Sequence, residues 1–282
     1  MFKFAKPYRI ALVAPSGPCA PETVDAGKKV LESGGCRVTV MPNVFSGCTL
    51  EHLAADDDAR AGDINAAIDD ETVDIIWAVR GGSGAGRLLN KINWQKLRKR
   101  EVLFAGFSDI TAIHWAMAKH GISGNLAAPM MSFLAKAADQ LSIDSLPEAV
   151  EGKAKEFRLP ALRKGEITGK VLPGNIAVAS SLCGTPFFPE TAEKILILEE
   201  IGEEPYRIDR MLTQLRLAGT FDRCAAVVFG HFTNCGDAGQ RMKVLQDFTA
   251  RVACPVFCGL PHGHELPFCS LSGRQTVTIR PL

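Results

Sequence analysis

The sequence lacks the features of a membrane-spanning or nucleic-acid-binding protein. No run of apolar residues reaches the roughly 18 that a spanning helix needs. Lys and Arg together number 32 and Asp and Glu 31, so the formal net charge is only +1. So small an excess of charge generates no strong field for nucleic acid or an anionic membrane. We therefore expect neither as a partner.

The sequence also lacks a pattern of metal ligands or of disulfides. Its nine cysteines are odd in number and scattered, and no CxxC pair or HExxH motif occurs. Such spacing is typical of reduced thiols, several of them buried as small apolar groups. Two histidines in one loop, His262 and His264, form a His-x-His that could begin a metal site, but no further ligand motif accompanies them. We expect no metal and no cofactor.

The N-terminus shows early positive charge and then a short apolar run. The run IALVA at residues 10–14 is too short for the hydrophobic region of a signal peptide, and a Pro-Ser-Gly-Pro turn follows it. We interpret it as a buried strand and expect a cytoplasmic protein.

The first half of the chain alternates buried strands with helices. The apolar patterns predict strands at residues 9–14, 36–41, 73–79 and 102–106, and helices at residues 21–34, 51–69 and 110–120. The three aspartates 56–58 are expected on the solvated side of the second helix. Strands separated by helices of this length indicate βαβ units and a parallel sheet of the Rossmann or flavodoxin-like kind. Functional groups then belong at the carboxyl ends of the strands.

The second half is richer in strands. Residues 136–160 are polar and contain two prolines, which indicates a connection, whereas later segments predict strands at 166–172, 195–199, 225–230 and 275–280 and a helix at 206–218. The fold class is therefore α/β, an N-terminal parallel-sheet domain with a smaller, mixed α/β, strand-rich C-terminal domain. We place the N-terminal domain at residues 1–135, the linker at 136–164 and the C-terminal domain at 165–282.

Two turns at strand ends carry candidate catalytic groups. Ser108 follows the buried strand 102–106 and precedes a helix, a geometry that exposes a hydroxyl beside helix N–H groups, although the same residues could simply cap the helix. The turn Arg80–Gly86 has four glycines, so its backbone can approach a ligand closely. It could be an oxyanion or carboxylate site, a flexible turn, or a dinucleotide loop.

Two further groups lie in the second half. Glu199 closes the apolar strand 195–199, where it could orient a histidine or simply mark a solvated strand end. His264 lies in a loop with Gly and Pro, where an imidazole could transfer protons near neutral pH. The order Ser, Glu, His is compatible with a catalytic triad, but spacing alone does not establish proximity.

Seven segments together make the chain resemble the serine LD-carboxypeptidases, the family of muramoyltetrapeptide carboxypeptidases and microcin C immunity peptidases. The resemblance covers nearly the whole chain. The segments are IALVAPSGP at 10–18, AVRGGSGAGRLL at 78–89, FAGFSDITAIH at 104–114, GN at 174–175, CGTPFFP at 183–189, ILILEEIGEEPYRIDRMLTQLRLAGTF at 195–221 and LPHGH at 260–264.

The resemblance implies a role for each matching residue. Ser108 would be the nucleophile and His264, rather than His262, the general base, which Glu199 would orient. The backbone N–H groups of Gly82 and Asp109 would form the oxyanion hole. The expected substrate is a murein tetrapeptide ending in diaminopimelate–D-Ala, or a related small peptide, and the expected assembly is a homodimer without metal or cofactor. Because a carboxypeptidase must recognise a free carboxylate, we name Arg80 as the leading candidate, with a structural ion pair as the alternative.

Some features depart from the family pattern and leave alternatives open. Ser83 stands where the family usually has an aromatic residue, and Pro173 where it usually has glycine; the change at Ser83 concerns the shape of the substrate pocket. A peptidase of aminoacyl-nucleotide antibiotics would have the same mechanism and would need an aromatic residue poised to stack on adenine. A non-catalytic nucleotide-binding module, resting on the glycine-rich turn, and an inactive binder of cell-wall peptides are further alternatives.

Overall fold

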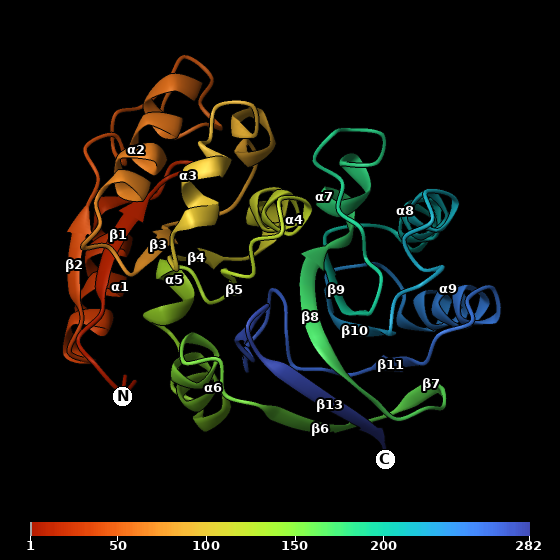
Figure 1. Ribbon diagram of the computed structural model, residues 1–282. Coiled ribbons are helices and arrows are strands. Elements are labelled where there is room, and N and C mark those ends of the chain that lie inside the picture. The colour runs from red at the N-terminus through yellow and green to blue at the C-terminus, as the bar shows by residue number, and fades with distance from the viewer. Residues whose placement is uncertain (1) are drawn as a thin grey trace.

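A computed structural model describes residues 2–282, which form two β-sheets flanked by helices (Figure 1). The α/β class expected from the sequence is confirmed. Among the described residues no helix is long and apolar enough to cross a membrane.

The first sheet has the strand order β12-β5-β4-β3-β1-β2. All its neighbouring strands are parallel except β12, which comes from the C-terminal end of the chain and pairs antiparallel with β5. The strands are β1 (Arg9–Val13), β2 (Arg37–Val40), β3 (Ile75–Ala78), β4 (Leu103–Gly106), β5 (Asn125–Ala127) and β12 (Leu271–Ser272). β3 and β4 are buried throughout, as their unbroken apolar sequences predict.

Helices connect these strands. They are α1 (Pro21–Ser33), α2 (Asp57–Asp69), α3 (Trp94–Lys99), α4 (Thr111–Lys119), α5 (Met131–Leu134) and α6 (Gln140–Val150). The prediction of a helix from residue 51 is wrong, because α2 begins at Asp57. Asp56 is its N-cap and accepts a hydrogen bond from the N–H of Ala59 at 2.8 Å.

The second sheet is mixed and has the order β6-β13-β8-β9-β10-β11-β7. Its central strands β8, β9, β10 and β11 are parallel, whereas β13 and β7 pair antiparallel with β8 and β11. The strands are β6 (Lys155–Leu159), β7 (Ala161–Arg163), β8 (Ile167–Asn175), β9 (Lys194–Ile201), β10 (Ala226–Thr233), β11 (Val256–Cys258) and β13 (Thr276–Pro281). The helices are α7 (Ile176–Ser181), α8 (Pro205–Leu217) and α9 (Ala238–Ala250).

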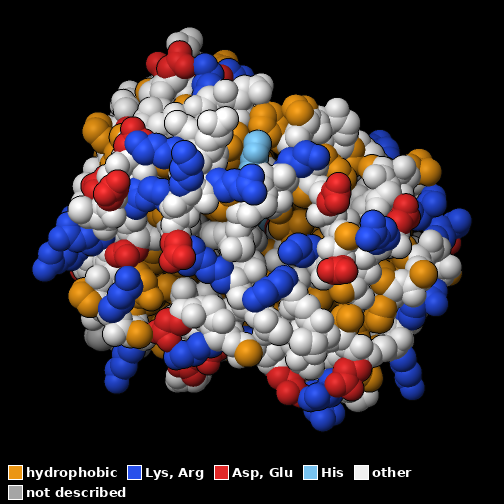
Figure 2. All heavy atoms as spheres, viewed as in Figure 1, with side chains coloured by type: hydrophobic (Ala, Val, Ile, Leu, Met, Phe, Trp, Pro, Cys, Tyr) orange, Lys and Arg blue, Asp and Glu red, His pale blue; other side chains and the backbone are white. Residues whose placement is uncertain are grey.

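The two sheets meet through α4, which lies between them and packs against β8 (Figure 1). The indole Nε1–H of Trp115 on α4 donates to the carbonyl of Pro173 on β8 at 3.1 Å. Lys, Arg, Asp and Glu side chains are interspersed over the face shown in Figure 2, in keeping with the balanced composition.

Candidate active site

Ser108 lies on a strained turn between β4 and α4. Its φ is +61°, a left-handed conformation that non-glycine residues rarely adopt outside special sites. Gly106, two residues earlier, has φ +153°, and a methyl group there would lie 2.9 Å from Cγ1 of Ile110. The chain can therefore turn sharply from a buried strand into a helix and present the Ser108 hydroxyl at the carboxyl end of the sheet.

The glycine-rich turn after β3 packs directly on this serine. A methyl group on Gly81 would lie 3.1 Å from Cβ of Ser108, so a side chain at this position would crowd the serine. Gly82 has φ +107°, and the N–H of Gly17 donates to the carbonyl of Gly81 at 3.0 Å. The turn is thus held between the Ser16–Gly17 segment and Ser108.

Glu199 and His264 reach the same place from the second sheet. Glu199 lies near the carboxyl end of β9 and is 1% exposed. His264 follows Gly263, whose φ of +136° turns the loop back toward Glu199. The ring of His264 packs 4.9 Å, between centroids, from the ring of Phe107, the residue before Ser108.

The three side chains form a continuous hydrogen-bonded chain. The Nδ1 atom of His264 lies 2.7 Å from Oε2 of Glu199, and its Nε2 atom lies 3.1 Å from Oγ of Ser108. Because a carboxylate only accepts, Nδ1–H must donate to Glu199, which leaves Nε2 free to accept from the serine hydroxyl. This arrangement can take a proton from Ser108.

Asp109 ties the turns together through its side chain. Its Oδ2 atom accepts from the hydroxyl of Ser16 at 2.6 Å and from the N–H of Ala85 at 2.8 Å. Burial raises the pKa of this carboxyl, and the two hydrogen bonds and the Arg60 charge act in the opposite direction. From the sequence, only the backbone of Asp109 was predicted to take part in catalysis, and Ser16 was not predicted as a site residue.

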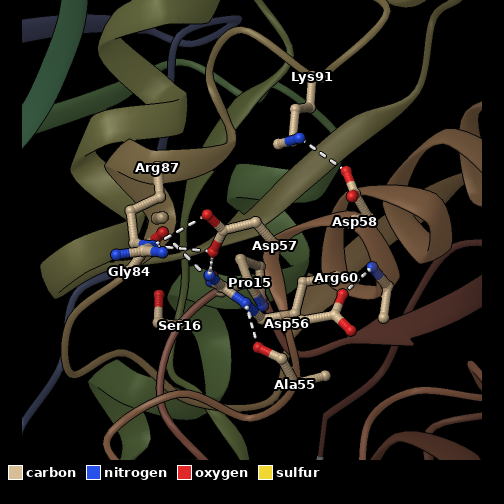
Figure 3. Close-up of polar contacts among 12 residues, drawn as sticks. Pro15, Ser16, Ala55, Asp56, Asp57, Asp58, Arg60, Gly84, Arg87 and Lys91 are labelled. Carbon is tan, nitrogen blue, oxygen red and sulfur yellow. Dashed lines mark hydrogen bonds and ion pairs between the residues drawn. The ribbon is translucent and has the colours of Figure 1, made fainter. Parts of the chain in front are cut away.

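The buried guanidinium of Arg60 hydrogen-bonds to the turns around Pro15 and Gly84 that pack near Ser108 (Figure 3). Arg60 on α2 has no exposed side-chain surface and donates to the carbonyls of Pro15, Ala55 and Gly84. It also pairs with Asp57 at 2.5 Å, and Asp57 in turn accepts from Arg87 at 2.8 Å. Asp57, predicted on the solvated side of its helix, is partly exposed and also links Arg60 to Arg87.

A cavity of about 580 Å³ opens onto Ser108 and His264. Arg80 is its only Lys, Arg, Asp or Glu lining residue, and its guanidinium is exposed and donates to the carbonyl of Pro18 at 2.6 Å. Phe133 and Ile201 supply apolar wall. Ser83 is not among the lining residues.

Other histidines of the sequence have different surroundings. His262 is buried, and its Nδ1 atom lies 2.8 Å from the carbonyl oxygen of Cys269. His114, buried in α4, bonds the carbonyl of Phe104 at 2.8 Å, and burial lowers its pKa to about 4. Within residues 2–282 no cluster of three or more His, Cys, Asp or Glu side chains is placed to hold a metal ion.

Comparison with known proteins identifies the family. The LD-carboxypeptidase N-terminal domain matches residues 10–127, and the LD-carboxypeptidase C-terminal domain matches residues 168–279. A putative carboxypeptidase of Streptomyces coelicolor is 34% identical over 93% of this chain and 87% of the relative. The chain belongs to the LD-carboxypeptidase family, as its motifs predicted, and is a serine carboxypeptidase of that family.

Solved structures agree with this assignment. Muramoyltetrapeptide carboxypeptidase from Oxalobacter formigenes is 29% identical and matches with a TM-score of 0.82 over 94% of this chain and 92% of that one. An MccF-like protein from Bacillus anthracis shares the fold, with a TM-score of 0.86 over 98% of this chain and 94% of that one, at 20% identity.

Proposed function

We propose that this enzyme is an LD-carboxypeptidase of murein tetrapeptides, which hydrolyses the amide between the L-centre of diaminopimelate and a terminal D-Ala during peptidoglycan recycling. The hydrogen-bonded chain from Ser108 through His264 to Glu199 carries the proposal. The named activity of the similar Oxalobacter formigenes enzyme supports the choice of substrate.

In the proposed mechanism Ser108 attacks the carbonyl carbon while its proton passes to Nε2 of His264. Glu199 holds the imidazole in the Nδ1–H tautomer and stabilises the imidazolium that forms. The N–H groups of Gly82 and Asp109 stabilise the oxyanion, each such donor being worth about 2.7–4 kcal/mol in the transition state. His264 then protonates the leaving D-Ala amine, and water, activated by the same histidine, hydrolyses the acyl-enzyme.

Arg80 is the proposed partner of the terminal carboxylate. It lines the cavity beside Ser108 and is the one cationic side chain there that is permanently charged. Its single hydrogen bond to Pro18 engages one guanidinium nitrogen and leaves others for a carboxylate.

The test is release of D-Ala from L-Ala-γ-D-Glu-meso-diaminopimelate-D-Ala. We expect release by the wild type with or without a chelator, none by Ser108→Ala, and a loss of about 10⁴-fold in kcat for Glu199→Gln, which favours the wrong imidazole tautomer. Glu190→Gln, an exposed change, is the matched control. Activity that survives in Ser108→Ala would overturn the mechanism.

A well-folded wild type that leaves the tetrapeptide intact would overturn the choice of substrate and favour an aminoacyl-nucleotide substrate. Trp77, Trp94 and Trp115 are 0, 8 and 0% exposed and none lines the cavity, so stacking on adenine would fall to Phe107 or Phe133, which do. The close packing of Gly81 on Ser108 favours an oxyanion site over a dinucleotide loop.

We further propose that the enzyme works in the cytoplasm as a homodimer, the assembly that the family resemblance implies. Sedimentation velocity is expected to give twice the mass of the 30.4 kDa chain. A monomer at micromolar concentration would contradict this part of the proposal.

A further inference from the structure

The ladder between β9 and β10 contains a bulge directly opposite Glu199. Leu198 pairs with Phe229 and Glu200 pairs with Phe232, so Gly230 and His231 on β10 face the single residue Glu199 on β9. Bulges of this kind re-aim side chains and are frequent beside active sites. The irregularity brings His231, which the mechanism above does not use, alongside the proposed triad.

Packing around Gly263 confirms that these side chains are neighbours. A methyl group on Gly263 would lie 3.0 Å from Cβ of His231 and 3.1 Å from Oε2 of Glu199. The N–H of His231 also donates to the carbonyl of His262 at 2.7 Å. His231 therefore lies close to Glu199 and is hydrogen-bonded to the loop that carries His264.

Two buried polar atoms at this place have no hydrogen-bond partner within residues 2–282. They are Oε1 of Glu199 and Nδ1 of His231. The first can only accept, and the second can donate when it carries the ring proton. Burial without a partner is unfavourable for both atoms, and one accepts what the other can donate, so their needs are complementary.

Burial favours a neutral His231 ring with a single N–H. Burial lowers the pKa of His231, and the neighbouring Glu265 and Glu199 oppose that effect while His264 adds to it. His262, on the adjacent loop, is itself buried, and burial lowers its pKa too. Near neutral pH the question is therefore which nitrogen of His231 holds its one proton.

We propose that His231 is a positioning residue whose Nδ1–H donates, across one buried water, to Oε1 of Glu199. Oε1 of Glu199 is then fixed by this water while Oε2 accepts from Nδ1–H of His264. The inference rests on the proposed function and deepens it, because it adds a fourth side chain to the hydrogen-bonded chain of Ser108, His264 and Glu199. His231 touches no reacting atom.

Two substitutions separate hydrogen bonding from packing. His231→Phe keeps the ring volume and removes the donor, whereas His231→Asn loses volume and can place an amide N–H near the position of Nδ1. We expect His231→Phe to lower kcat about 10-fold with KM within about twofold of wild type.

His231→Asn should recover most of kcat, and His52→Phe, an exposed change, should alter neither kcat nor KM. The opposite order, with Phe active and Asn impaired, would show that His231 only fills space and would overturn the inference. Wild-type protein with ¹⁵N-labelled histidine provides a measurement free of folding effects. Its His231 resonances, assigned by their absence in His231→Asn, are expected to show the Nδ1–H tautomer, and an Nε2–H tautomer would also overturn it.

A fluorophosphonate, which phosphonylates serine nucleophiles with loss of fluoride, separates this inference from the proposed substrate. We expect Ser108 to label about 10-fold more slowly in His231→Phe and near the wild-type rate in His231→Asn. If wild type leaves the murein tetrapeptide intact but this labelling pattern holds, the substrate is wrong and the role of His231 stands. Labelling that depends on His264 and Glu199 but not on His231 overturns the inference.

Discussion

Neighbouring glutamates on β9 have opposite surroundings because successive side chains of a strand point to opposite faces. Glu199 faces His264, whereas Glu200, 2% exposed, accepts from Nδ2 of Asn175 at 2.9 Å and from the N–H of Ala177 at 2.7 Å. It also accepts from the N–H of Ile201 at 2.9 Å. Glu200 thereby joins β9 to the end of β8 and the start of α7.

Glu200 should make stability depend on pH. Burial raises the pKa of this carboxyl, so the folded state holds the proton more tightly than the unfolded chain. Its contribution to stability is therefore greatest below the unfolded pKa near 4.3 and falls as pH rises through the folded pKa. Glu200→Gln lacks this titration and puts an amide NH₂ against donors, so we expect it to be less stable by about 1–3 kcal/mol.

Urea unfolding of both proteins between pH 4.5 and 7.5 checks this expectation. The advantage of wild type over Glu200→Gln should shrink as pH rises, and Glu190→Gln should show no such trend. An advantage that grows with pH would mean that hydrogen bonding to the ionised carboxylate outweighs its burial.

At the residue scale, the sequence identified the candidate catalytic residues but not the side chains that pack and hydrogen-bond around them. Ser108, Glu199 and His264 were singled out because strand ends and a Gly-Pro loop favour functional groups, and the family resemblance supplied their roles. Arg60 and Ser16 were not singled out, because their importance comes from carbonyls and a carboxylate contributed by turns distant in the chain. No local pattern records such contacts.

The contact between α4 and β8 depends on the absence of a side chain at Gly174. A methyl group there would lie 2.7 Å from Nε1 of Trp115, the group that bonds Pro173. We expect Gly174→Ala to lower the free energy of unfolding by about 1–3 kcal/mol through overpacking. Gly62, exposed inside α2 with open space around it, is the matched control.

Gly62→Ala should raise the free energy of unfolding by about 0.5–1 kcal/mol, because glycine is a poor helix residue. Thermal and urea unfolding of the two variants measure the predicted decrease and increase in the free energy of unfolding. A neutral Gly174→Ala would show that α4 and β8 can separate slightly at no cost.

Elements with strong apolar patterns were the ones that the sequence predicted. β1, β3, β4 and β9 are continuous apolar runs, and α8 shows a helical period, so each was predicted within one or two residues. β6 and β7 lie in residues 136–164, where exposed positions interrupt the pattern, and their pairing with β13 and β11 comes from far along the chain. The domain boundaries stay a prediction.

The whole molecule should unfold as one unit, because the C-terminal segment belongs to both sheets. β12 pairs with β5 of the first sheet, and β13 lies between β6 and β8 of the second. All three tryptophans lie between residues 77 and 115, so their fluorescence reports mainly on the first half and, through the contact of Trp115 with Pro173, on its junction with the second. We expect Ile279→Ala, a buried change on β13, to destabilise by about 2–5 kcal/mol.

That loss should shift the urea midpoint of tryptophan fluorescence as much as that of far-ultraviolet circular dichroism. Tryptophan fluorescence that keeps its wild-type midpoint while the circular dichroism divides into two transitions would show that the halves unfold separately.

The distance along the chain between Ser108 and His264, 156 residues, has a consequence for synthesis. A ribosome makes the proposed nucleophile long before its base, and until the loop at His264 has emerged and packed on β9 the serine is an ordinary alcohol. Under the proposed mechanism, chains that terminate early, or that are clipped before this loop, would carry Ser108 and yet leave the proposed substrate untouched, which would confine hydrolysis to nearly finished, folded molecules.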